Sequence, residues 1–334
     1  MCMRKKLKSI AAALAVLLGL SGCSSQAEAV IDYQAEMVEL LSGIRNYGDS
    51  KRPGFQLIAN GGSPLYLADN GNSAENAGRM LQLMDGQMAE SVFYRWDTEQ
   101  NCAVETDPDE TAYFEYTLAV PRNAGLTVLS LDYVDSPEME ADSYKMNAEQ
   151  GYLGWASYRR SLDEIPGAAP HGMNTGNIKS LKEARNYLVL LNPGRFKSRQ
   201  DYLDKLAATY YDLLIVDLYY GTEPLTPEEV KALQHKPNGA QRQVFAYMSV
   251  GEAETYRPYW QGSWGVKMPD WLAAKNDDWA DNYKVKYWRP EWRQILYGSQ
   301  EAYLDRILSA GFDGAFLDVV DAYWYFLNPQ DETE

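Results

Sequence analysis

The sequence predicts an α/β protein, a (β/α)8 barrel in which eight parallel strands alternate with helices. Three observations predict this fold: short apolar runs end in polar residues, these runs alternate with amphipathic helical patterns, and eight candidate strands can be counted. A closed ring of eight strands leaves no sheet edge unpaired, whereas an open parallel sheet would have to cover its edges.

The C-terminal half supplies five of the candidate strands. They lie at residues 186–194, 211–221, 244–250, 283–287 and 311–317, of which 283–287 is the weakest. Helices are expected over SRQDYLDKLAATY and LTPEEVKALQ, the second with a Thr N-cap followed by Pro and Glu in the first turn. A single long amphipathic helix is expected over EWRQILYGSQEAYLDRILSAG, with glycine at its end.

The N-terminal half supplies three more candidate strands, in the segments at residues 54–62, 87–96 and 125–136. Within the second segment the strand is expected to end at Glu90. Helices are expected at residues 34–47 and over ENAGRMLQLMDG. A ninth strand candidate, GYLGWASYRR, is either accessory or takes the place of the weak strand at 283–287. The Pro/Gly/Asn-rich stretch IPGAAPHGMNTGN joins the two halves, and a split into two domains there is the alternative to one barrel.

The first 23 residues have the features of a leader that is removed from the mature protein. A basic segment, MRKKLK, precedes an apolar stretch too short to span a bilayer, and LSGC then places small residues before Cys23. This pattern predicts a lipoprotein signal at residues 1–23, with lipidation of Cys23, and one domain over residues 24–334; an ordinary secretory signal is the alternative. Ser24 and Ser25 favour a cell-envelope lipoprotein of the outer membrane or cell surface, attached to the membrane only through its lipid.

The amino-acid composition argues against several classes of function and site. A formal charge of −16 argues against nucleic-acid binding. Two histidines argue against a Ser-His-Asp triad, and one cysteine outside the leader, Cys102, excludes a disulfide framework; no metal or other cofactor is expected. Abundant carboxylates with 25 Tyr and 9 Trp suit a polysaccharide or oligosaccharide substrate, although these aromatic residues could equally fill a large core.

Two segments carry a resemblance to a known family. YMSVG at residues 247–251 with Glu254 and Arg257 matches a Tyr-x-Ser-x-Gly…Glu…Arg pattern, and GFDGAFLDVVDAY matches a segment with paired aspartates. Together they resemble glycoside hydrolase family 114, the endo-α-1,4-polygalactosaminidase-like TIM barrels. The resemblance implies a hydrolase that cleaves a glycan, with a galactosaminide-containing polymer as the expected substrate.

The order of the segments differs from that family. The strand with the paired aspartates is followed in the family by a helix and three further strands, and matching segments stand here at the start of the mature chain. We therefore expect a circularly permuted barrel with its joint near residues 165–178. A truncated or two-domain chain that shares the motifs is the alternative.

The resemblance implies that Glu90 and Asp318 are the catalytic pair. Glu90 is expected to be the general acid/base because its apolar neighbours would raise its pKa, and Asp318 the nucleophile or base. A structural or helix-capping role is the alternative for Asp318, and a buried salt bridge, for instance to Arg257, is the alternative for Glu90.

Further polar and aromatic residues are expected at the carboxyl ends of strands, where barrel enzymes bind substrate. Asp217 could also be catalytic or structural, Glu254 could simply hold Arg257, and Trp288, like Trp260, Trp264 and Trp324, could serve packing alone. The predicted substrate-binding residues are Asn60, Asp132, Tyr133, Asp217, Tyr247, Glu252, Glu254, Arg257, Trp288 and Asp321.

A function from another class also fits the sequence. The chain could be a surface lipoprotein that binds glycans on an inactive barrel, because the sequence does not give the separation of Glu90 and Asp318. Carboxyl groups about 5 Å apart would indicate retention of anomeric configuration, and roughly 6.5–9.5 Å would indicate inversion.

Overall fold

The computed structural model describes residues 31–69 and 71–328. The predicted leader and Cys23 lie outside these residues. Across the described part, no helix is long and apolar enough to cross a membrane.

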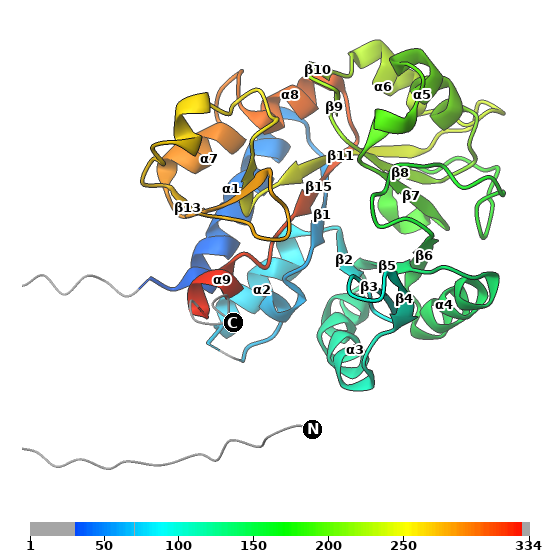
Figure 1. Ribbon diagram of the computed structural model, residues 1–334, viewed down its shortest axis with the longest axis horizontal. Coiled ribbons are helices and arrows are strands. Elements are labelled where there is room, and N and C mark those ends of the chain that lie inside the picture. Colours follow the sequence, from blue (N-terminus) through cyan, green and yellow to red (C-terminus); the bar gives the residue numbers. More distant parts are fainter. Residues whose placement is uncertain (1–30, 70, 329–334) are drawn as a thin grey trace, which may run out of the picture. The chain divides into compact units, whose positions relative to one another are not determined.

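Eight parallel strands form a nearly closed barrel surrounded by helices (Figure 1), as the sequence predicts. The sheet order is β6-β5-β2-β1-β15-β11-β8-β7, so strands from both halves of the chain share one sheet. The strands are β1 (Gln56–Asn60), β2 (Gly86–Glu90), β5 (Thr127–Tyr133), β6 (Leu153–Ser157), β7 (Tyr187–Leu190), β8 (Leu213–Val216), β11 (Gln243–Ser249) and β15 (Gly314–Asp318).

Helices cover the outside of the ring. Several begin at side-chain caps, such as Ser73, Ser136 and Ser198, and Thr226 forms a full capping box with Glu229. The helices are α1 (Tyr33–Lys51), α2 (Ala74–Leu83), α3 (Pro108–Asn123), α4 (Pro137–Gln150), α5 (Arg199–Ala207), α6 (Pro227–Leu233), α7 (Pro290–Leu296), α8 (Tyr303–Ala310) and α9 (Tyr323–Leu327).

Short antiparallel sheets are inserted after several barrel strands. They are the hairpin of β3 (Tyr94–Asp97) with β4 (Cys102–Glu105), the small pair of β9 (Tyr219–Tyr220) with β10 (Glu223–Pro224), and the three-stranded sheet of β12 (Glu252–Glu254), β14 (Asn282–Val285) and β13 (Leu272–Lys275).

Three expectations about the elements need correction. The ninth candidate is barrel strand β6, whereas the segment around Tyr283 is β14 of an accessory sheet, so each half gives four barrel strands rather than three and five. The long helix expected before the last strand is two helices, α7 and α8, because Gly298 between them has φ 106°, which breaks the helical path. The helices α3 and α4 lie in segments where the sequence analysis assigned none.

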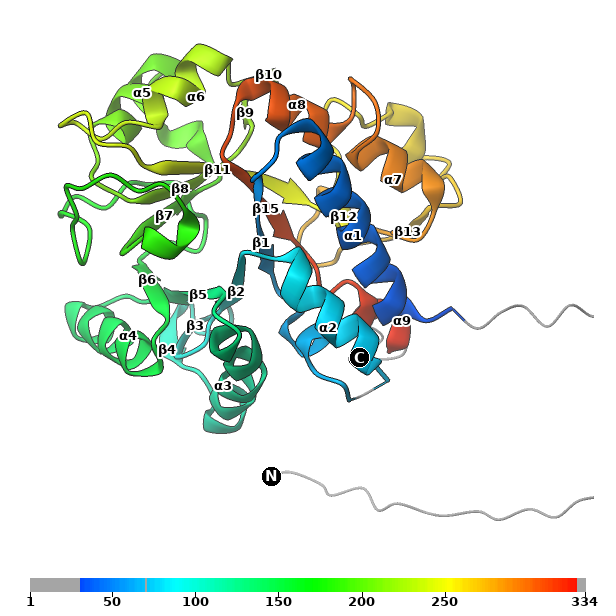
Figure 2. The ribbon, with the colours of Figure 1, turned by 180° about the vertical axis from the view of Figure 1, so that it is seen from behind.

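The ring closes between the first and last barrel strands. β1 pairs with β15 from Gln56↔Gly314 to Ala59↔Leu317, whereas no ladder joins β6 to β7, which follow one another along the chain. α1 precedes β1 and contacts both α2 and α8, so it covers the junction of β15 with β1, as Figure 2 shows from behind. Circular permutation stays a prediction, and these are the features that it requires.

Candidate active site

Five side chains at the carboxyl ends of five neighbouring strands form one chain of hydrogen bonds. Asn60 Nδ2 donates to Glu90 Oε1 at 2.9 Å and to Asp318 Oδ1 at 2.8 Å. Tyr133 donates its hydroxyl hydrogen to Glu90 Oε2 at 2.6 Å, and Tyr247 donates to Asp318 Oδ2 at 2.9 Å. The order of the side chains is the order of β5, β2, β1, β15 and β11 in the sheet. The barrel therefore joins two carboxyl groups that are far apart in the sequence.

The two carboxyl groups are close enough to act on one glycosidic bond. Because a single amide nitrogen of Asn60 donates to both, the two bonded oxygens lie within about 6 Å of each other, nearer the spacing of retaining than of inverting glycosidases. Asp318 Oδ1 also accepts the backbone N–H of Val319 at 2.9 Å. Glu90 makes no ion pair with Arg257, because Arg257 is bound to other carboxylates.

Asp318 has a raised pKa. Burial, and then the charge of Glu90, raise the pKa of Asp318 to about 7, although hydrogen bonds from Asn60 and Tyr247 oppose the rise. Two carboxyl groups this close titrate as one unit. Below about pH 7 the pair therefore keeps one proton.

The backbone is strained immediately after each of these carboxylates. Ser91, which follows Glu90, has φ 62°, and Val319, which follows Asp318, has φ 60°. A non-glycine residue with φ near +60° costs about 1–3 kcal/mol of conformational free energy, and such residues are concentrated at functional sites. Sequence reasoning had no signal for this strain, because neither residue is one that prefers positive φ.

Asp321 is an exposed residue beside the pair. Its carboxyl group packs against the backbone of Gly61, where an added Cβ would lie 2.9 Å from Asp321 Cγ. Gly61 also has φ 72°, so both space and conformation favour glycine there. Packing against Gly61 buries the carboxyl group and raises the pKa of Asp321 to about 6, and its predicted binding role stays a prediction.

Asp132 faces away from the mouth. Side chains alternate along a strand, so the neighbours Tyr133 and Asp132 point to opposite sides of β5. The Asp132 carboxylate is fully buried and accepts hydrogen bonds from Phe93 N, Ser143 Oγ and Asn147 Nδ2. Its binding role is not supported by this position; it connects β5 to α4.

Arg257, Glu254 and Asp217 form a buried ionic cluster. Arg257 Nε donates to Glu254 at 2.6 Å and Arg257 Nη1 donates to Asp217 at 2.8 Å, with the Arg257 side chain 3 % exposed. The guanidinium also lies 5.7 Å from the ring of Tyr247. The three charged groups satisfy one another rather than pointing to a sugar, and they support the tyrosine that donates to Asp318.

Glu252 anchors the loop between β13 and β14. Its side chain is 5 % exposed and accepts hydrogen bonds from Asn276 Nδ2 at 2.7 Å and Asn282 Nδ2 at 2.9 Å. It thereby fixes both ends of the loop at residues 276–282, so its role here is to position a loop near the mouth.

Trp288 belongs to an aromatic cluster near the start of α1. Its ring centroid lies 5.1 Å from that of Tyr33 and 4.7 Å from that of Phe326, with Tyr287 also in contact. Packing therefore explains Trp288. Another tryptophan, Trp96 of β3, has no signal in the sequence and lines a hollow beside Glu90.

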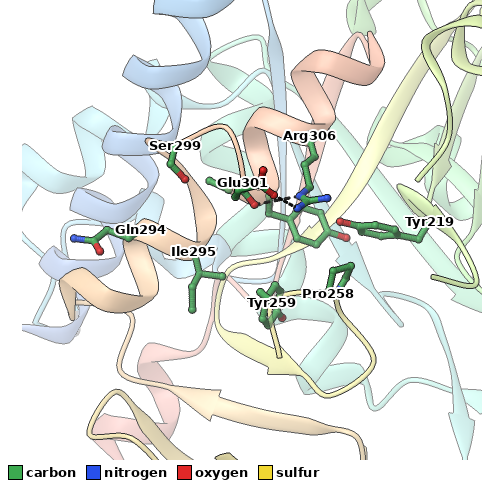
Figure 3. Close-up of a pocket in the computed structure, with 10 residues that line it drawn as sticks. Tyr219, Pro258, Tyr259, Gln294, Ile295, Ser299, Glu301 and Arg306 are labelled. Atoms are coloured by element: carbon green, nitrogen blue, oxygen red, sulfur yellow. Dashed lines mark hydrogen bonds and ion pairs between the residues drawn. The ribbon is translucent and has the colours of Figure 1, made fainter. Parts of the chain in front are cut away.

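One hollow in the described part of the molecule contains a member of the pair. This hollow, of about 310 Å³, is lined by Glu90, Ser91, Trp96, Thr98, Tyr133, Arg160 and Asp278. Another hollow, of about 280 Å³ (Figure 3), lies where Tyr219, Tyr259 and Arg306 come together. Tyr219 and Tyr303 separate it from the buried Arg257, because both rings also face that guanidinium. We therefore place the candidate active site at Glu90 and Asp318.

Both sequence motifs fall in a part of the chain that matches a known family. Residues 193–334 match glycoside-hydrolase family GH114. The resemblance expected from the sequence is confirmed over this GH114 segment, which carries Asp318, Asp321 and Tyr247. Glu90, Asn60 and Tyr133 lie outside it.

Relatives of the chain have been found in three prokaryotes. An uncharacterized protein of Methanocaldococcus jannaschii is 35% identical over 156 residues, which are 46% of this chain and 42% of that protein. An uncharacterized protein of Deinococcus radiodurans is 37% identical over 37% of this chain and 38% of its own length, and one of Thermotoga maritima is 34% identical over 36% of each. The chain thus matches less than half the length of these relatives.

A solved chitinase from Bacteroides thetaiotaomicron is similar at a TM-score of 0.38 with 8% identity, over 79% of this chain and 88% of that one. This likeness is too low to support a function.

Proposed function

We propose that this protein is a glycoside hydrolase that uses Glu90 and Asp318 as its two carboxyl groups. The observation that carries the proposal is the pair of hydrogen bonds from one Asn60 nitrogen to both groups. Glycoside cleavage needs two carboxyl groups on either side of the scissile bond, and the GH114 segment supplies one of them.

Glu90 acts as general acid/base and Asp318 as nucleophile in this proposal. Asp318 accepts three hydrogen bonds, from Asn60, Tyr247 and Val319, whereas Glu90 accepts two. These donors stabilise the charged form of Asp318 that attacks the anomeric carbon, and they oppose the rise that burial causes in its pKa.

The reaction then follows in two steps. Glu90 gives its proton to the glycosidic oxygen while an Asp318 oxygen attacks the anomeric carbon, so the glycosidic bond breaks and a glycosyl ester forms. Glu90 next takes a proton from water, whose oxygen attacks the same carbon and releases Asp318. Each step inverts the configuration of the anomeric carbon, so the product keeps the configuration of the substrate.

The substrate that we propose is a polymer containing galactosaminide, cut within the chain. Exposed Asp321 beside Asp318 suits the ammonium group of a de-N-acetylated amino sugar. The family resemblance supports the same class of substrate.

Retention of configuration is the test of this function. Partly de-N-acetylated galactosaminide polymer should be cut into shorter oligosaccharides, and proton NMR recorded in the first minutes should show new reducing ends with the anomeric configuration of the polymer. Inverted products would contradict the role of Asp318. Binding without any cleavage would instead indicate a glycan-binding protein with an inactive barrel.

Activity is expected to fall as pH rises through about 7. The last proton of the pair leaves with the raised pKa of Asp318, about 7, and above that pH no proton remains for the leaving oxygen. The measurement is kcat/KM against pH, with thermal denaturation at each pH to show that the protein stays folded. A rate that stays constant from pH 6 to pH 9 would contradict the shared proton.

A further inference from the structure

The hollow beside Glu90 lies on the side of the pair that receives the leaving group. It is lined by Glu90 and Tyr133 but by neither Asp318 nor Asp321. Because the acid protonates the oxygen that departs, the sugar attached to that oxygen lies beyond Glu90, away from the nucleophile. If Glu90 and Asp318 act as proposed, this hollow holds that sugar.

Three segments outside the barrel strands build the walls of the hollow. The β3–β4 hairpin contributes Trp96 and Thr98, the segment after β6 contributes Arg160, and the loop at residues 276–282 contributes Asp278. Trp96 is half-buried, and the loop is held at both ends by Glu252. The walls are therefore fixed by contacts that the catalytic step does not use.

Arg160 is the cation of this hollow. Its guanidinium lies 5.4 Å from the ring centroid of Trp279 in the loop, and its side chain is exposed. A guanidinium only donates hydrogen bonds and is always charged. It therefore favours an oxygen-bearing neutral substituent, such as a hydroxyl or an acyl carbonyl, and disfavours an ammonium group.

On the Glu90 side the guanidinium of Arg160 and the carboxylate of Asp278 line one hollow, so their charges oppose each other and the hollow suits a sugar that carries no charge. Asp321 is exposed on the Asp318 side, whereas Arg160 is exposed on the Glu90 side, with Trp96 to face the sugar ring. Asp278 on the opposite wall can accept a hydrogen bond from a hydroxyl of that ring.

We propose that Trp96 and Arg160 form a leaving-group subsite for an uncharged, N-acylated sugar, so that bonds between a free amino sugar and an N-acylated one are cut preferentially. This inference rests on the proposed function. The segments that carry Trp96 and Arg160 lie outside the GH114 segment, so the subsite belongs to the remainder of the chain.

The test is the identity of the residue at each new non-reducing end. Galactosaminide polymer acetylated at random on half of its amino groups is digested, and the products are sequenced by mass spectrometry. The protein should give new non-reducing ends enriched in N-acetylated residues by about fivefold, the effect of one partly exposed charge contact. Arg160→Ala should abolish the enrichment and Arg160→Lys should keep part of it, whereas Arg79→Ala, which changes a partly exposed arginine on α2, should change nothing. If the protein without substitutions gives new non-reducing ends that are not enriched in N-acetylated residues, the proposed subsite is wrong.

A binding measurement separates failure of the subsite from failure of the hydrolase function. Asp318→Asn protein is titrated by calorimetry with tetrasaccharides of galactosamine and of N-acetylgalactosamine. Arg160→Ala in that background should weaken binding of the N-acetylated tetrasaccharide about fivefold and leave or improve binding of the cationic one. Equal effects on both tetrasaccharides would overturn the subsite, even if hydrolysis is observed. If Arg160→Ala weakens binding of the N-acetylated tetrasaccharide alone and no form of the protein hydrolyses the polymer, the subsite is supported and the hydrolase function is contradicted.

Discussion

Glu90→Gln is expected to lower kcat for polymer by about 10²–10⁴-fold, the usual contribution of a positioned general acid/base. Glutamine keeps the size of the side chain and can still accept from Tyr133, but it carries no proton to give. Asp318→Asn removes the nucleophile and should lose at least as much activity. Initial rates of new reducing ends measure both losses.

The two variants should differ on a substrate with a good leaving group. An aryl galactosaminide with an acidic phenol needs little protonation, so Glu90→Gln should still release phenol in a burst, whereas Asp318→Asn should not. The reverse pattern would exchange the two roles. Glu110→Gln, an exposed carboxylate on α3, is the matched control and should keep full activity. If Glu90→Gln and Asp318→Asn both keep their activity, these two carboxyl groups do not catalyse the reaction.

Asp212→Ala is expected to lower the free energy of unfolding by about 3–5 kcal/mol, the cost of leaving a buried charge unpaired. Asp212 and Lys236 are both fully buried, with Lys236 Nζ 2.5 Å from Asp212 Oδ1. Lys236 also donates to the backbone oxygens of Asn174 and Gly176 at 2.8 Å each. The pair therefore fastens the segment between β6 and β7, near the predicted permutation joint, to the barrel. Urea denaturation followed by tryptophan fluorescence measures the loss.

A double variant shows whether the unpaired charge is the cause. Asp212→Ala with Lys236→Met removes both charges and should recover much of the lost stability, because no buried cation remains. Glu149→Ala breaks an exposed pair with Lys145 and should change stability by no more than about 1 kcal/mol. If the double variant is as unstable as Asp212→Ala, lost packing rather than charge is responsible.

Much of the barrel could be predicted from local pattern. The strands that end at Asn60, Glu90 and Asp318 are apolar runs followed by polar residues, and buried parallel strands have this pattern because both of their faces are covered. The weak strand around Tyr283 misled the prediction because an antiparallel accessory strand has similar residues. A short apolar run does not say which sheet it will join.

The site was predicted less completely than the fold. The proposed catalytic pair lies together with Asn60, Tyr133 and Tyr247, because strand ends of one barrel face a common mouth. Asp132 and Arg257 did not join them, since the first points outward and the second is held by two buried carboxylates. Trp96 and Arg160 were missed because they lie in insertions that share no motif with the strand ends.

The sequence by itself determined most of the barrel strands, the acidic and aromatic character, and the motif around Asp318, because these depend on residue types and on spacing within one segment. Only the tertiary structure decided which carboxylates meet and which are buried, because the ring of strands sets distances between residues as far apart as Asn60 and Asp318. It also decided that Asp318 has a raised pKa, since burial and the nearby charge of Glu90 exist only in the folded chain.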